Sequence, residues 1–185
     1  MRTSFANQFL IAMPAMEDPN FEHTVTYICE HGPHGALGIV INRQVDITLK
    51  TVFEHMQIDV ADPRKGELPV FLGGPVQGER GFVLHSPAGD WGSTVYVTDD
   101  LAVTTSRDIL EAMAAGGGPD NVLVALGYAG WGPGQLEHEI TQNAWLTGPA
   151  DPRVIFETPV EQRWRAAAKL MGIDLALLQR DAGHA

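Results

Sequence analysis

The sequence has one cysteine, Cys29, and few basic residues. A single thiol cannot form an intramolecular disulfide, and it cannot build a zinc site from several thiolates. Lys plus Arg number 12 and Asp plus Glu number 23, which gives a formal net charge of −11. So acidic a chain repels nucleic acid and anionic membranes unless its basic residues cluster. We therefore expect no direct binding to either.

Long apolar runs and targeting signals are also missing. The N-terminal apolar run, Phe9 to Met13, is too short for a secretory signal, and Pro14 interrupts it. No stretch approaches the ~20 apolar residues that span a bilayer. Because a free cysteine without a leader is typical of reducing compartments, we expect a cytoplasmic protein.

Standard catalytic motifs are absent as well. The chain has no Walker phosphate loop, no dinucleotide fingerprint and no G-x-S-x-G nucleophile elbow, and Gln142 stands where a zinc-protease helix needs its second histidine. Glu30, His31 and His34 could together hold a divalent metal, but such a group in a turn is more often a solvated tip. We expect no cofactor and no metal.

What is present indicates a globular α+β protein. The 185 residues, 44% hydrophobic and 19% charged, fit one domain spanning residues 1–185. Thr24–Glu30 alternates apolar and polar residues, and residues 36–41 form a continuous apolar run, so a hairpin of two strands is predicted. Thr48 precedes an apolar stripe with helical spacing.

Further elements follow from similar patterns. Strands are expected at Val70–Leu72, Gly81–His85, Thr94–Thr98, Asn121–Tyr128 and Val154–Phe156. Helices are expected after Thr105, from Gly132-Pro133, after the capping sequence Thr158–Glu161, and briefly over Leu175–Gln179. About four or five helices thus flank a sheet that is not a regular βαβ repeat.

Several segments in order resemble the AlgH/YqgE family of small bacterial proteins. They are FLIAMPAMEDPNF from Phe9, TYICEHGPHGALGIVINR from Thr26, FLGGPV from Phe71, GFVLHS from Gly81, TTSRDILEAMAAG from Thr104, LGYAGWGPGQLEHEI from Leu126, NAWL from Asn143 and the terminal GHA. The resemblance implies a bifurcated mixed sheet folded into a pseudo-barrel. It also implies a transcription-linked regulatory role, and it carries no catalytic residues to this chain.

Two positions could support chemistry. Cys29 and His31 lie two residues apart on a predicted strand, so an imidazole could activate the thiol as a nucleophile or redox sensor. His85 ends another predicted strand and could act as a general base. The alternatives are a buried packing cysteine, which we favour because free cysteines are usually buried, and a hydrogen-bonded strand-end histidine.

The glycine-rich segment Gly127–Gly134 is predicted to be a loop between a strand and a helix. Gly130 and Gly134 would let backbone N–H groups approach a polar or anionic ligand, and Trp131 could stack on it. The alternative, which we favour, is a tight turn in which Trp131 fills the core.

Two more strand ends extend this hypothesis to a cleft. Asn42 and Arg43 end the predicted central strand, and Gly73 and Gly74 follow another. Together with the glycine-rich loop they would bind a polar or anionic small molecule. The function favoured is regulation through such a ligand or a protein partner, and the alternative is an enzyme or redox sensor.

Overall fold

The computed structural model describes residues 4–178 and contains one ten-stranded sheet. Its strands are β1 (Gln8–Ala12), β2 (Val25–Gly32), β3 (Gly35–Val40), β4 (Gln44–Thr48), β5 (Pro69–Leu72), β6 (Val76–Ser86), β7 (Thr94–Tyr96), β8 (Ala102–Thr104), β9 (Asn121–Trp131) and β10 (Trp145–Pro149). The main path runs β10-β1-β2-β3-β9-β6-β8-β7, with β4 and β5 branching from it.

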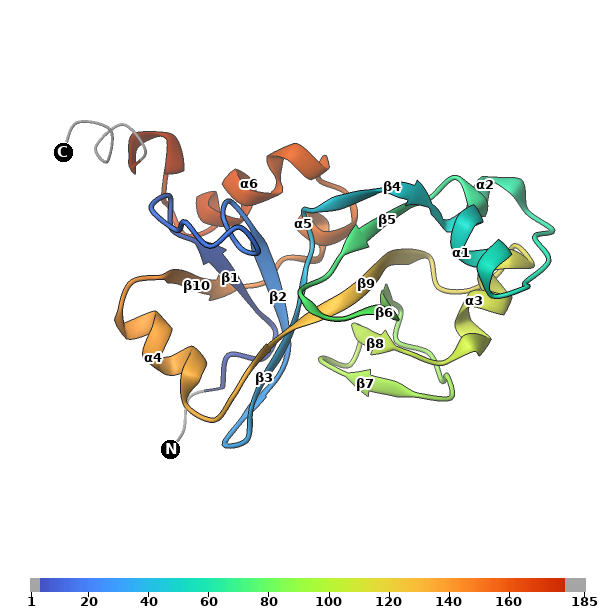
Figure 1. Cartoon of the computed structure of the whole chain (residues 1–185), viewed down its shortest axis with the longest axis horizontal. Coiled ribbons are helices and arrows are strands. Elements are labelled where there is room, and N and C mark those ends of the chain that lie inside the picture. The colour runs from blue at the N-terminus through green and yellow to red at the C-terminus, as the bar shows by residue number, and fades with distance from the viewer. Residues whose placement is uncertain (1–3, 179–185) are drawn as a thin grey trace.

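Helices lie on the sheet at three places. They are α1 (Leu49–His55), α2 (Pro63–Gly66), α3 (Arg107–Ala114), α4 (Gln135–Thr141), α5 (Pro152–Phe156), the 3-10 helix η1 (Val160–Gln162) and α6 (Arg163–Lys169). Figure 1 shows α1, α2 and α3 gathered at one end of β9, and α4 near its other end. Residues 175–178 form a further helical turn, and Gln179, the predicted end of that helix, lies outside the described residues, as does the terminal GHA.

The sheet forks along β9. The first part of β9 pairs with β6 on one side and, in parallel, with β5 on the other. Beyond Gly127 its β5 side pairs instead with β3, through residues 129–131. The predicted fold, an α+β protein with a bifurcated mixed sheet folded into a pseudo-barrel, is confirmed (Figure 1).

Three apolar cores follow from the alternation of side chains along β9. Leu123 and Ala125 join the core under α5 and α6, whereas Val124 faces a second core under α1 and α3. Ala129 and Trp131 enter a third core with α4. A strand that is buried on both faces explains why its sequence is an almost continuous apolar run.

Several predicted elements differ in the structure. The predicted loop over residues 127–134 is wrong, because β9 continues to Trp131 and pairs with β3. The strand predicted at Val154–Phe156 is helix α5, whose start is capped by Asp151. The capping sequence at Thr158 opens η1 rather than an α-helix, and its hydroxyl donates to the Arg153 carbonyl instead.

Candidate functional site

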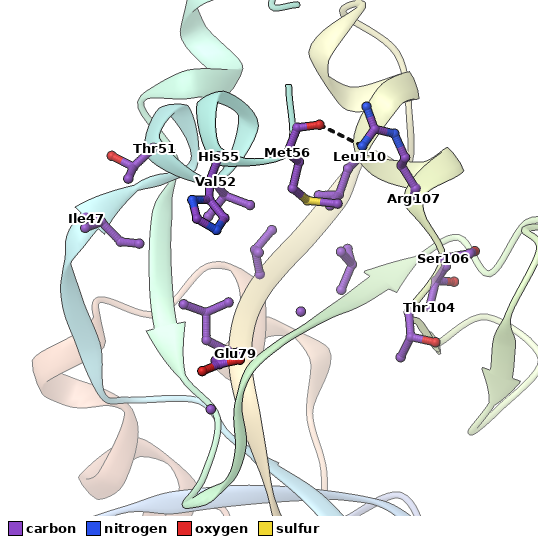
Figure 2. Close-up of a pocket in the computed structure, with 16 residues that line it drawn as sticks. Ile47, Thr51, Val52, His55, Met56, Glu79, Thr104, Ser106, Arg107 and Leu110 are labelled. Atoms are coloured by element: carbon purple, nitrogen blue, oxygen red, sulfur yellow. Dashed lines mark hydrogen bonds between the residues drawn. The ribbon is translucent and has the colours of Figure 1, made fainter. Parts of the chain in front are cut away.

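A cavity of about 480 Å³ opens beside the second core, between α1 and α3 (Figure 2). Its volume lies within the range of small-molecule sites, ~300–1,000 Å³. The residues that line it are Ile47, Thr51, Val52, His55, Met56, Gly78, Glu79, Gly81, Val83, Thr104, Thr105, Ser106, Arg107, Leu110, Val124 and Leu126. The buried lining residues, which form its floor, are mainly apolar, as at Val83, Leu110 and Val124. The exposed lining residues, which form its mouth, are mainly polar, and they include Thr51, His55, Glu79 and Arg107.

Strand alternation builds the floor. On β6, Gly81 and Val83 face the cavity, while Phe82 and Leu84 between and beyond them face the opposite core. Because Gly81 has no side chain, and a Cβ there would meet no atom within 4 Å, this position leaves open space in the floor. Val124 from β9 completes the apolar surface.

Arg107 ties the two helical walls together. Its guanidinium donates to the carbonyl oxygens of Met56 (2.7 Å) and Gln57 (3.5 Å), which directly follow α1. Its Nε lies 3.7 Å from a carboxylate oxygen of Glu111. A cation at a helix C-terminus offsets the negative end of the helix dipole. The positive charge at this part of the rim is therefore already partnered.

The start of α3 is held by a hydrogen-bond network. The Ser106 hydroxyl donates to Asp108 (2.6 Å) and accepts the Ser93 N–H (3.0 Å), and Asp108 also accepts the Gly92 N–H (2.8 Å). These bonds, led by that from Ser106, lower the pKa of Asp108. The network fixes the loop before β7 against the rim of the cavity.

Of the predicted cleft residues, Gly73 and Gly74 meet the backbone of β9 at the fork of the sheet. The Gly73 N–H donates to the Leu126 carbonyl and its carbonyl accepts from Val40, both at 2.8 Å. A Cβ on Gly73 would collide with the Gly127 carbonyl oxygen, and one on Gly74 with the backbone of Tyr128. Glycine is needed here because two chain segments cross where the sheet forks.

Asn42 and Arg43 clamp the segment before β2. Asn42 accepts the Val25 N–H and donates to the His23 carbonyl, both at 2.9 Å. The Arg43 guanidinium donates to the carbonyl oxygens of Pro19 (2.5 Å) and Glu22 (3.1 Å). Ligand binding through these two side chains stays a prediction, and both already have partners within the chain.

Trp131 packs in the third core. Its indole Nε1 donates to Glu139 (3.1 Å), which also accepts from the indole of Trp145 (2.9 Å). Gly130 pairs with β3, and Gly134 adopts a left-handed conformation at the start of α4. The structure thus places Trp131 inside the core, as the favoured alternative expected, but on strand β9 rather than in a tight turn.

Cys29 is buried and separate from the His31 imidazole. Its thiol points to the Tyr27 carbonyl oxygen at 3.7 Å, and burial raises the pKa of the thiol well above its ordinary value. His31 instead accepts the Phe5 N–H at Nδ1 and lies 3.0 Å from Glu137 at Nε2. Such an environment does not favour a thiolate at neutral pH.

His85 is fully buried beneath the cavity wall. Its ring nitrogens lie 3.0 Å from the Pro87 carbonyl oxygen and 2.7 Å from the Thr104 hydroxyl. Its neighbour Ser86 donates to Asp100 rather than to the imidazole. His85 thus supports Thr104, a lining residue, and does not itself line the cavity.

Sequence reasoning missed the cavity itself. Val52 and Met56 belong to the apolar stripe that follows Thr48, but such a stripe predicts only that its residues pack on the sheet. The available signal was Gly81, a small residue in a strand position that alternation assigns to the buried face.

Within residues 4–178, no helix combines the length and apolar character needed to cross a bilayer. In the same part of the chain, His, Cys, Asp and Glu nowhere form a group of three or more that could hold a metal ion.

Close relatives cover almost the whole chain. A family model described as AlgH-like matches residues 9–176. A UPF0301 protein of Thioalkalivibrio sulfidiphilus is 64% identical over 183 residues, which are 99% of this chain and 98% of the relative. A UPF0301 protein of Nitrosococcus oceani is 56% identical over 181 residues, with 98% and 97% coverage.

Solved structures agree with these relatives. The solution structure of the AlgH protein from Pseudomonas aeruginosa matches with a TM-score of 0.82 at 48% identity, over 96% of this chain and 94% of that one. A crystal structure from Corynebacterium diphtheriae matches with a TM-score of 0.73 over 96% and 93% of the chains, and at 20% identity it shows the fold alone. The resemblance expected from the sequence motifs is confirmed, and the chain belongs to the AlgH-like family.

Proposed function

We propose that this protein is a cytoplasmic regulatory binding protein that takes a small, largely apolar ligand in the cavity between α1 and α3. The observation that carries the proposal is the cavity of about 480 Å³ itself, with an apolar floor and a polar mouth. Such a combination is typical of ligand sites, where apolar area supplies affinity and a few polar groups supply orientation.

The alternative, an enzyme or redox sensor, receives less support from the geometry. Cys29 and His85 are both buried and both lie outside the lining of this cavity. Burial raises the pKa of the Cys29 thiol and lowers that of the His85 imidazole, so neither adopts its charged form readily.

Regulation without direct DNA contact is part of the proposal. Besides the net charge of −11, three arginines donate hydrogen bonds from their guanidinium groups to backbone carbonyl oxygens of the same chain. Arg43 bonds Pro19, Arg107 bonds Met56, and Arg163 bonds Ile41. Basic groups held in this way are less available for phosphates.

The test uses 4-phenylbutanol, an uncharged apolar probe. We expect it to shift the backbone amide NMR signals of cavity residues such as Val83 and Val124. Gly81→Leu should abolish the shifts, because the new side chain enters open space on the cavity side of β6. The matched control is Gly32→Leu, which adds the same side chain to open space outside this cavity and should leave the shifts intact.

Two outcomes would contradict the proposal. One is the absence of any amide shift in the cavity at probe concentrations of about 10 mM, a generous excess for a ligand of this size. The other is binding that persists unchanged in Gly81→Leu, which would place the probe elsewhere.

A further inference from the structure

The rim of the cavity carries an uncompensated negative charge at Glu79. This residue lies in an exposed segment of β6, where the register with β9 shifts between the pairs Val76–Tyr128 and Gly81–Leu126. Among the described residues, no hydrogen bond or ion pair engages its carboxylate. Figure 2 shows Glu79 at the lower end of the cavity and His55 pointing into it from α1.

The cations nearest in sequence or at the same rim are directed elsewhere. Arg80 donates to Gln77 (3.4 Å) and lies over the Phe82 ring at 5.5 Å, on the opposite side of the strand. Arg107 is occupied by the end of α1 and by Glu111. Glu79 is thus the carboxylate that a ligand in the cavity would meet without competition from Arg80 or Arg107.

We infer that the ligand is an amphipathic amine, a small molecule with an apolar body and an ammonium group. The body would lie on Val83, Val124 and Leu126, and the ammonium group would pair with Glu79 at the mouth. The net charge of −11 also favours a cationic ligand, because it attracts cations to the protein surface and repels anions. This inference rests on the proposed function and specifies its ligand.

A matched series of probes separates the contribution of the ligand's charge to binding from the contribution of its apolar body. The series is 4-phenylbutylamine, 4-phenylbutanol and 4-phenylbutyrate, which share a phenylalkyl chain and differ in their polar group. We expect the amine to bind most tightly and the carboxylate most weakly, by calorimetry or amide shifts. The advantage of the amine over the alcohol should shrink as salt is raised, because salt screens exposed charge pairs.

The Glu79→Gln variant tests the named residue. We expect it to weaken amine binding roughly three- to fivefold, the range of an exposed ion pair, and to leave alcohol binding unchanged. Glu17→Gln is the matched control, since it removes the same charge from an exposed residue outside the cavity lining. It should leave both affinities unchanged.

The failures of the two proposals are distinguishable. If the alcohol binds in the cavity but the amine binds no more tightly, or if Glu79→Gln weakens both equally or neither, the ammonium inference is overturned and the apolar site stands. If none of the three compounds binds in the cavity, both proposals are overturned.

Discussion

His85 Nε2 lies 2.7 Å from the hydroxyl of Thr104, and Nδ1 lies 3.0 Å from the Pro87 carbonyl oxygen. A carbonyl oxygen only accepts, so Nδ1 carries a proton, and in the neutral imidazole Nε2 accepts from Thr104. The imidazole is therefore held in one neutral tautomer, directly behind a residue that lines the cavity.

This arrangement predicts a loss of stability on acidification. Burial is the main cause that lowers the pKa of His85 in the folded state. The unfolded imidazole takes up a proton near its ordinary value of ~6.5, so below that value the unfolded state binds more protons than the folded one. We expect the free energy of unfolding to fall between about pH 7 and about pH 5, and His85→Gln to flatten that dependence.

Chemical unfolding at several pH values measures the effect. Carboxyl groups with a lowered pKa, such as Asp108, contribute to stability until the pH falls to about 4, their ordinary range. They therefore do not affect the change in stability between about pH 7 and about pH 5. His138→Gln is the control, since His138 is exposed on α4. If the free energy of unfolding changed equally with pH in the wild type and in His85→Gln, His85 would not be the titrating group.

The fork of the sheet predicts that its glycines tolerate no side chain. A Cβ on Gly73 would enter the Gly127 carbonyl, and neither backbone segment can move without breaking the pairing of β5 with β9. We expect Gly73→Ala to lower the free energy of unfolding by about 1–3 kcal/mol, the cost of overpacking.

Gly78→Ala is the control for this substitution. A Cβ at Gly78 meets no atom within 4 Å, so its effect should stay within about 0.5 kcal/mol. Denaturant titrations of both variants give the comparison. If Gly73→Ala were as stable as Gly78→Ala, the close approach at the fork would not exist in solution.

The same glycines show where sequence reasoning reached its limit. The glycines Gly73, Gly74 and Gly127 led to the prediction of a ligand-binding cleft, because glycine allows the backbone to come close to another group. A sequence cannot say whether a glycine approaches a ligand or another strand, because both need a missing Cβ and often a positive φ. Here the partner is the chain itself, joined by the Gly73–Leu126 and Val40–Gly73 hydrogen bonds.

Local patterns were informative where packing agreed with them. The alternation over Thr24–Glu30 and the continuous apolar run over residues 36–41 correctly predicted β2 and β3. The pattern failed at Val154–Phe156, where β-branched residues favoured a strand but Asp151 caps a helix. The cavity depends on long-range placement of α1 against α3, which no local pattern contains.

The Cys29 thiol should be unreactive in the folded protein. It is 4% exposed, and burial raises its pKa, so little thiolate is available to attack a reagent. We expect no reaction with Ellman's reagent under native conditions and one equivalent of reaction after unfolding in denaturant. Rapid stoichiometric labelling of the native protein would contradict this burial and would revive the redox alternative.

Trp164 anchors α6 to the sheet, so its substitution should lower the stability of the protein strongly. The residue is 6% exposed, its Nε1 donates to the Ala12 carbonyl (2.9 Å), and its ring stacks on His23 with centroids 4.3 Å apart. Trp164→Ala should therefore cost about 3–5 kcal/mol of unfolding free energy, since it empties a core position and leaves a buried carbonyl without its donor. Leu170→Ala is the matched control at the end of the same helix, because Leu170 is 48% exposed and should cost about 0.5 kcal/mol or less. A loss below about 1 kcal/mol for Trp164→Ala would mean that this face of α6 does not dock on β1 in solution.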